Sequence, residues 1–461
     1  MLKNLIRALR TNDSPKNKSQ EQTTALKTSQ PAFVRTELER SEHNISRKNI
    51  SKGALNIIYD LNNAGYEAYL VGGGIRDLLL GLHPKDFDVA TNATPEEIKR
   101  LFRRARIVGR RFQIVHVSMG RETIEVTTFR ANHTLAPPVE PNDVKQKSVQ
   151  SESGMLLRDN VFGSIEEDAL RRDFTANALY YTVKDFKIID FTGGLADIES
   201  KTLRMIGDPT TRYLEDPVRM LRAIRFAAKL NFSIEEETQS PIYALAENIQ
   251  QVAAARLFEE VNKLFLNINA RCCFKLSLEY NLFQQLFPTV CVELDKRPIY
   301  KRIIEEALSD TSQRIQQHKP ITPAFMYACM LWPRVETLYN ELLSEGNTAQ
   351  HAMQIASFKA IDEQYPIVSI PKRFSIAMRE IWSMQHSLIK ANNKRALNLL
   401  SHPRFRAAYD FLLLRERAGA ELPRGAKYWT DLQEQHPVAV SNEKRRKRHH
   451  RPRRGNNKPK T

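Results

Sequence analysis

Two aspartates separated by one residue form the first group in this chain that could carry chemistry. Asp86 and Asp88 follow an apolar run, three consecutive glycines and a short helical pattern. In a strand, residues two apart share a face, so the two carboxylates should project together while Phe87 and Val89 pack inward. Like charges this close repel each other unless a cation lies between them. The pattern therefore predicts a site for Mg²⁺ or Mn²⁺, hard cations that prefer carboxylate oxygen.

A hairpin downstream offers a third carboxylate. Its strands are predicted at residues 115–117 and 123–127, with a turn around Gly120. Ile124 and Val126 take one face, which leaves Glu125 on the other. Glu125 can therefore join the two aspartates, although such a residue, taken alone, is more often a solvated surface charge.

Two further stretches combine acids and bases at helical spacing. Residues 165–180 are predicted to form a helix, in which Asp168 and Arg172 are four apart, as are Asp173 and Asn177. Such pairs on a surface contribute only tenths of a kcal/mol. A second helix is predicted to open at Asp216, which is placed as its N-cap before a proline.

That second helix also carries a basic stripe. Arginines recur every three residues at positions 219, 222 and 225, opposite an apolar side formed by Leu221, Ile224 and Ala228. A stripe of this kind is often merely solvated.

These motifs, in this order, resemble those of the class II nucleotidyltransferases of the DNA polymerase β-like superfamily. The resemblance rests on the glycine turn with Arg76 and Asp77, on Asp86-Phe87-Asp88, on Glu125 to Arg130, on Arg171 to Asn177, and on Glu215 to Phe226. The superfamily includes bacterial poly(A) polymerases and CCA-adding enzymes. Two stretches, Gly109 to His116 and His402 to Arg415, resemble the poly(A) polymerases more than the CCA-adding enzymes.

The resemblance implies roles for individual residues. Asp86 and Asp88 would hold metal, and either Glu125 or Asp168 would be the third catalytic carboxylate, a choice that the sequence leaves open. Asp216 and Arg219 would select adenine. The complete set implied to bind the nucleotide is Gly72, Gly73, Gly74, Arg76, Arg171, Arg172, Asp173, Asn177, Asp216, Arg219, Arg222 and Arg225.

The charge balance points to a polyanionic partner. The net charge is +17, and the residues from Lys444 to the end hold ten Lys or Arg and no acid. Backbone contact with RNA is the function we favour for that run, rather than a solubilising tail. The residues expected to touch RNA are Arg110, Arg111, Lys444, Arg445, Arg446, Lys447, Arg448, Arg451, Arg453 and Arg454.

Other classes of protein are disfavoured. The four cysteines form no CxxC pair, so a zinc site or disulfide framework is not expected, and a reducing, cytoplasmic setting fits. No apolar run approaches the roughly 20 residues of a membrane span. We instead predict three folded parts between two disordered ends. Residues 41–202 form an α/β head with a mixed, mostly antiparallel sheet, residues 203–270 an all-α neck, and residues 271–437 an all-α body. Residues 1–40 and the basic tail, 438–461, are predicted to be disordered.

The expected function is template-independent addition of AMP from ATP to RNA 3′ ends, with RNA-decay proteins as implied partners. A CCA-adding tRNA nucleotidyltransferase is the alternative, because it shares nearly every motif. An RNA-binding protein that kept the fold but lost catalysis is a third reading, and the intact acidic set argues against it.

Overall fold

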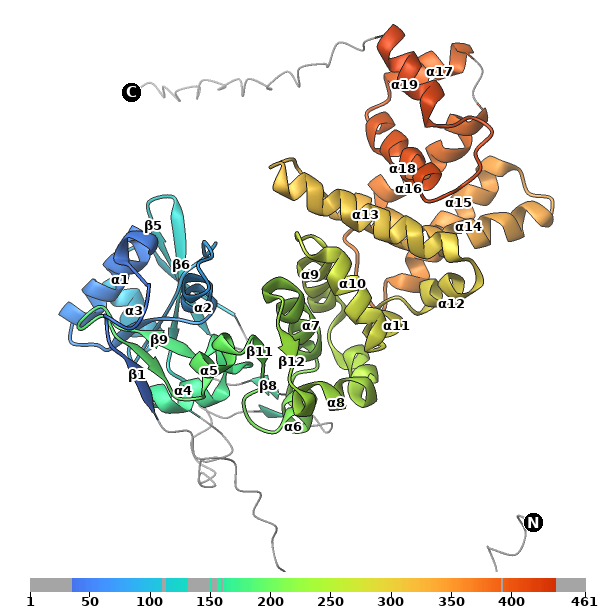
Figure 1. Ribbon diagram of the computed structural model, residues 1–461. Helices are drawn as coiled ribbons and strands as arrows, with labels where there is room; N and C mark the ends of the chain where they lie inside the picture. Colours follow the sequence, from blue (N-terminus) through green and yellow to red (C-terminus); the bar gives the residue numbers. More distant parts are fainter. Residues whose placement is uncertain are drawn as a thin grey trace, which may run out of the picture.

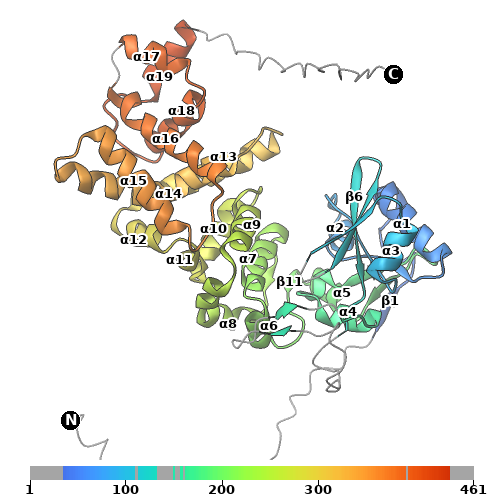
Figure 2. The same ribbon diagram turned by 180° about the vertical axis from the view of Figure 1, so that it is seen from behind.

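The computed structural model describes residues 35–109, 113–131, 149–150, 156–158, 161–390 and 393–436. Arg110, Arg111 and the whole predicted basic tail lie outside these ranges. The described chain runs from an α/β head through a helical neck to a helical body, and both views show the three parts in this succession (Figure 1, Figure 2).

The head is built on one eight-stranded sheet with the strand order β1-β10-β9-β2-β3-β6-β5-β4. Among the described strands of this sheet, only β3 and β6 pair in parallel; the other pairings are antiparallel. The predicted mixed, mostly antiparallel sheet is thus confirmed. The strands are β1 Thr36–Leu38, β2 Ala68–Val71, β3 Asp88–Thr91, β4 Ala105–Val108, β5 Ile114–Met119, β6 Glu122–Thr128, β9 Leu179–Tyr181 and β10 Ile188–Asp190.

Strand alternation divides the head core into two layers. Leu70 and Val89 belong to the large apolar core with helices α1 and α3, whereas their neighbours Val71 and Ala90 pack with Ala169 of α4. The acidic residues therefore share a face with α4. The helices of the head are η1 Arg47–Asn49, α1 Lys52–Asn63, α2 Gly73–Leu79, α3 Pro95–Leu101, α4 Ile165–Arg171, η2 Thr175–Asn177 and α5 Gly194–Glu199.

Among the described residues, two separate two-stranded sheets are present in addition to the large sheet of the head. Strands β7 Val149–Gln150 and β8 Leu156–Arg158 pair with each other, and β11 Thr202–Leu203 pairs in parallel with β12 Ser233–Ile234. The helices that follow the head are α6 Pro209–Glu215, α7 Val218–Leu230, α8 Glu236–Leu245, η3 Ala246–Gln251, α9 Ala254–Phe265, α10 Ala270–Glu279, α11 Leu282–Leu286, α12 Pro288–Lys296, α13 Pro298–Gln316, α14 Pro323–Ser344, α15 Ala349–Gln364, α16 Lys372–Lys390, α17 Asn393–Leu400, α18 Phe405–Arg417 and α19 Ala426–Gln435.

The structure corrects two local expectations. Residues 36–38, placed in the disordered N-terminal segment, form edge strand β1, because they pair with β10 about 150 residues later. The helix predicted over 165–180 ends at Arg171, and the chain continues through η2 into β9. Pairing of β9 with β2 and β10 overrides the local helical pattern.

Candidate active site

The acidic group is assembled at the parallel pair of strands in the head. Asp88 begins β3 and pairs in register with Glu125 of β6, so the two side chains lie side by side on one face of the sheet. Burial, followed by the charges of Glu125 and Asp86, raises the pKa of Asp88 to about 6. Asp86 is exposed and precedes the strand rather than belonging to it. Phe87 and Val89 are buried, as predicted.

The donor chemistry of this group fits a divalent cation. Burial and, after it, repulsion by Glu125 and Asp86 raise the pKa of Asp88, and a bound cation would offset both effects. No three His, Cys, Asp or Glu side chains converge on a common metal position in the described part of the chain. Asp86 and Glu125 are exposed and the charges of both act on Asp88, so these three carboxylates are the groups that would hold a cation there.

The glycine turn lies directly beside these acids. Gly72 has φ of 78°, which favours glycine, and its N–H donates to the Leu179 carbonyl at 3.2 Å. A Cβ at Gly72 would be 3.5 Å from Nη1 of Arg172 and 4.0 Å from Oδ2 of Asp88. The turn therefore lies in contact with Arg172 and Asp88, although its three glycines are not themselves part of the cavity lining described below.

A cluster of guanidinium groups faces the acids. Burial, followed by the charges of Arg130, Arg212 and Arg219, lowers the pKa of Arg171 to about 9. Arg212 donates to the carbonyls of Arg171 and Arg172 at 2.5 and 2.7 Å, which fixes the end of α4. Several guanidinium groups close together in a partly buried site favour the binding of an anionic ligand.

Asp168 lies in the same region, but it is held in a different way from Glu125. Its Oδ2 accepts from Nη2 of Arg172 at 2.9 Å and from the Tyr180 hydroxyl at 2.7 Å, and its Oδ1 accepts from the Arg130 N–H at 3.2 Å. The residue is buried, with 6% of its surface exposed. The predicted contact between Asp168 and Arg172 is therefore present.

Arg76 and Asn177, both implied as nucleotide-binding residues, lie beneath the glycine turn. Arg76 donates to Asp77 Oδ1 through Nε at 3.0 Å and Nη2 at 2.6 Å, and its Nη1 donates to the Asn177 side-chain oxygen. Asn177 in turn donates to Asp173 at 3.0 Å. These contacts occupy both side chains within the protein and support the turn from below.

The residues expected to read the base are held by neighbours in the neck. Asp216 accepts two hydrogen bonds of 2.8 Å from Arg256 of α9, and Arg219 donates to Glu215 at 2.8 Å. Helix α7 begins at Val218, one residue later than predicted, with Pro217 at the N-cap position. Arg225 lies 4.5 Å from the centre of the Phe226 ring and is absent from the lining of the cavity described next.

A single cavity of about 400 Å³ brings most of these residues together. The predicted residues among its lining are Asp88, Glu125, Asp168, Arg171, Arg172, Asp173, Asp216, Arg219 and Arg222. Sequence reasoning missed Arg130, Arg256 and Glu260, which also line it. A signal for the last two was present: they are an oppositely charged pair four apart on α9, beside its apolar stripe.

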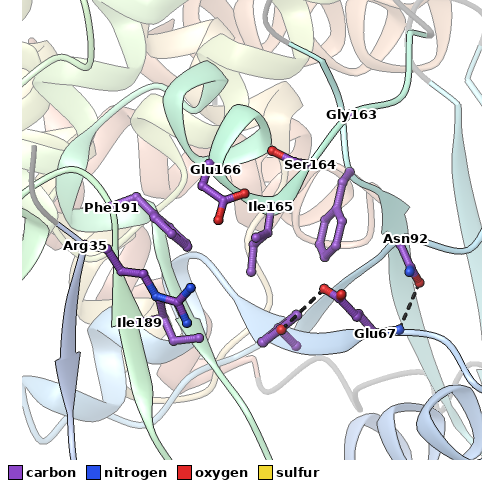
Figure 3. Close-up of a pocket in the computed structure, with 11 residues that line it drawn as sticks. Arg35, Glu67, Asn92, Gly163, Ser164, Ile165, Glu166, Ile189 and Phe191 are labelled. Atoms are coloured by element: carbon purple, nitrogen blue, oxygen red, sulfur yellow. Dashed lines mark hydrogen bonds between the residues drawn. The ribbon is translucent and has the colours of Figure 1, made fainter.

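A second hollow lies on the same face of the head sheet, near the start of α4. Its volume is about 390 Å³, and Arg35, Glu67, Tyr69 and Glu166 are among its lining residues (Figure 3). None of the predicted site residues lines it. It is thus distinct from the acidic and basic cavity.

Two global expectations can be compared with the structure. Cys272, Cys273, Cys291 and Cys329 are all free thiols. In the described ranges, no helix combines the length and the apolar character needed to cross a bilayer.

Comparison with known families agrees with this geometry. Residues 68–204 match the family described as "Poly A polymerase head domain". Residues 231–294 match "Probable RNA and SrmB- binding site of polymerase A", and residues 345–460 match "Polymerase A arginine-rich C-terminus".

Comparison with curated proteins separates the two candidate enzymes. The chain is 49% identical to poly(A) polymerase I of Escherichia coli over 86% of both chains. It is 42% identical to poly(A) polymerase I of Haemophilus influenzae, over 90% of this chain and 94% of that protein. A CCA-adding enzyme of Lactobacillus helveticus is 35% identical over only 50% of this chain and 54% of its own.

Solved structures support the fold. A tRNA nucleotidyltransferase in complex with a primer tRNA and an incoming ATP analogue superposes with a TM-score of 0.52 at 21% identity, covering 82% of this chain and 98% of that one. An apo CCA-adding enzyme gives a TM-score of 0.55 at 20% identity, covering 85% and 84%. From the extent of the sequence identity, the chain belongs to the bacterial poly(A) polymerase I family, class II nucleotidyltransferases that are related to the CCA-adding enzymes.

Proposed function

We propose that this poly(A) polymerase extends RNA 3′ ends without a template, and that Asp86, Asp88 and Glu125 hold two Mg²⁺ or Mn²⁺ ions for the transfer. The observation that carries the proposal is the in-register pair of Asp88 and Glu125 facing an arginine cluster across one cavity. When bound, such metals lower the pKa of the attacking 3′-hydroxyl and offset charge on the departing pyrophosphate.

Glu125 is our choice for the third metal-side carboxylate. It is exposed beside Asp88, and its charge already contributes to the raised pKa of that residue. Asp168 has three donors of its own within the protein. We assign to Asp168 the task of holding Arg172 in the cavity.

Activity at graded Mg²⁺ concentrations distinguishes the two acids. Glu125→Gln should shift half-maximal activity to higher Mg²⁺. Asp168→Asn should lower activity without that shift and should raise the KM for ATP, because Arg172 loses its partner. The opposite pattern would exchange the two roles.

The triphosphate is proposed to lie between the glycine turn and the arginine cluster. The N–H groups of Gly73 and Gly74 at the start of α2 would supply donors, since that of Gly72 is taken by the Leu179 carbonyl, and Arg171 and Arg172 supply positive charge in the cavity. Arg222 adds charge from α7, where it is fixed by Asp173 at 2.7 Å.

Adenine selection is proposed for Asp216 and Arg219. A carboxylate can accept from the exocyclic amine of adenine, and a guanidinium can donate to a ring nitrogen. Both groups line the cavity, and both are orientated by a neighbour, Arg256 for Asp216 and Glu215 for Arg219. A fixed protein surface would thus take the place of a template base.

RNA is proposed to contact the basic residues of the chain, including Arg110, Arg111 and the run from Lys444 to Arg454, with a steep salt dependence. The match at residues 231–294 to a probable RNA- and SrmB-binding region supports binding of RNA, and of a protein such as SrmB, by the neck and the start of the body. We further propose a cytoplasmic setting, in which the four cysteines stay reduced.

Incubation of the purified protein with a generic RNA and one nucleotide at a time tests the function. Long tails made from ATP alone support the proposal. Addition of C and A restricted to tRNA lacking its terminus would favour the CCA-adding alternative. The double variant Asp86→Ala with Asp88→Ala should add no nucleotide yet still bind RNA, whereas an unmutated protein that also adds none would favour a binding protein.

A further inference from the structure

Helix α7 begins two residues after Asp216, carries Arg219 in its first turn and is attached to the head at two points. Near its middle, Arg222 donates to Asp173 at 2.7 Å through Nε and 2.5 Å through Nη2. In its last turn, Nζ of Lys229 donates to Oδ2 of Asp77 at 2.7 Å. The two attachments are about 10 Å apart at the rise of an α-helix, so together they fix the tilt of α7 as well as its position.

The two attachments are the ends of one buried hydrogen-bonded chain. From Asp77 the chain passes to Arg76, then to Asn177, and from Asn177 to Asp173. Arg76 is 1% exposed, and Asp77 and Asn177 are each 6% exposed. In a buried network of this kind the geometry of each member depends on its neighbours.

The chain also lies directly beneath the glycine turn. A Cβ at Gly73 would be 3.3 Å from Nη2 of Arg76. The same guanidinium lies 5.1 Å from the centre of the Phe226 ring of α7, and the guanidinium of Arg222 lies 5.3 Å from it. Arg76 therefore contacts both the glycine turn and α7, so a change in the tilt of α7 would act on the turn.

We propose that Lys229, which lies outside the cavity lining, is a positioning residue for nucleotide selection. Its contact with Asp77 holds the far end of α7, so that Asp216 and Arg219 keep their distance from the glycine turn. The inference rests on the proposed function, because the tilt of α7 affects selection only if those two residues read the base. Displacements near 1 Å in such a site cost up to roughly 100-fold in rate.

The test is steady-state transfer to a generic RNA with ATP and with CTP, for Lys229→Ala, Lys229→Met and Lys229→Arg. For the alanine and methionine variants we expect the KM for ATP to rise about fivefold or more, and the preference for ATP over CTP in kcat/KM to fall by a similar factor. Lys229→Arg should restore both, because it keeps a donor in reach of Asp77.

A matched control lies in the body. Lys296 has the same arrangement, an exposed lysine that contacts a buried acid, Glu293, at 3.2 Å. Lys296→Ala should lower the thermal midpoint about as much as Lys229→Ala and leave both kinetic measures unchanged. This comparison separates positioning from a general loss of stability.

Asn177→Ala provides a second measurement, because it severs the chain between the two attachments. Addition of Lys229→Ala to Asn177→Ala should then change the ATP preference much less than Lys229→Ala does alone. Unchanged KM and ATP preference in a folded Lys229→Ala, with an active unmutated protein, would overturn the inference. An unmutated protein that adds no nucleotide would instead overturn the proposed function.

Discussion

The Asp88 carboxylate lies beside that of Glu125, because β3 and β6 run parallel and pair these two residues in register. Burial and this neighbour raise the pKa of Asp88 from 3.8 to about 6. Without a cation, the folded protein thus binds this proton more tightly than the unfolded chain does. The protonated Asp88 therefore contributes to the free energy of unfolding below pH 3.8, and this contribution is lost as the pH rises through about 6.

Asp88→Asn should therefore stabilise the metal-free protein at pH 7 and have a smaller effect near pH 4. Thermal unfolding in a chelator across this range measures the difference. Mg²⁺ should raise the midpoint of the unmutated protein and leave Asp88→Asn nearly unchanged. If Asp88→Asn is no more stable than the parent at any pH in chelator, Asp88 is not held at a raised pKa by burial and by Glu125.

The sequence predicted the face of each acid but could not predict their adjacency. Alternation places Glu125 on the polar side of its strand, whereas its position beside Asp88 depends on a parallel pairing between strands distant in the sequence. Asp86 was predicted within the strand, but β3 begins only at Asp88. The pairing of Asp86 with Asp88 does not depend on this error, because a turn can also bring Asp86 close to Asp88.

Long-range contacts account for the other differences. Asp216 was predicted as an N-cap from the local pattern, but its two oxygens accept from Arg256, forty residues later. Asp173 and Asn177 do form the predicted contact, although through η2 rather than through a continuous helix. Spacing in the sequence therefore identified partners better than it identified the elements that carry them.

The Tyr180 hydroxyl joins Asp168 to Arg172, since it donates to the acid at 2.7 Å and accepts from Nε of the arginine at 3.1 Å. Tyr180→Phe should lower the free energy of unfolding by about 1–3 kcal/mol, as expected for a buried group left unpaired. It should also raise the KM for ATP. Tyr181→Phe, on the opposite face of the sheet, is the control and should leave the KM unchanged; an equal effect of both changes would argue against a role for this hydroxyl.

Asp173 should govern acid stability. Although burial opposes its ionisation, Arg222 and Asn177 hold its pKa well below 3.8. The stability it supplies is therefore present above that value and is lost as the pH falls below it. Asp173→Asn should cost about 1–3 kcal/mol at pH 7, because the partly buried Arg222 loses its charged partner, and less at pH 3.

Urea unfolding at the two pH values measures this change. Asp410 is a useful contrast, because burial raises its pKa, and its removal should have the opposite pH dependence. A cost of Asp173→Asn that stays constant between pH 7 and pH 3 would show that the carboxylate is not held ionised by Arg222.

Gly194, at the start of α5, should tolerate no side chain. An added Cβ would overlap the Thr175 carbonyl oxygen, and the carbonyl carbon would be only 2.8 Å away. Because these are backbone atoms, they cannot move aside cheaply, and Gly194→Ala should cost about 1–3 kcal/mol of folding free energy. Activity should fall too, since Thr175 precedes Asn177 in the support of the glycine turn.

Gly53→Ala in α1 is the matched control. A Cβ there would be 2.6 Å from the end of the Glu122 side chain, which can rotate away, and 3.2 Å from Cβ of Met119, which needs to move only a few tenths of an ångström; alanine also favours the helix. Denaturant unfolding of both variants should show a large loss for Gly194→Ala and little change for Gly53→Ala. Equal stability of the two variants would mean that the turn between β10 and α5 can shift to accept a side chain. The close contact between Gly194 and Thr175 would then not be needed to hold the glycine turn in place.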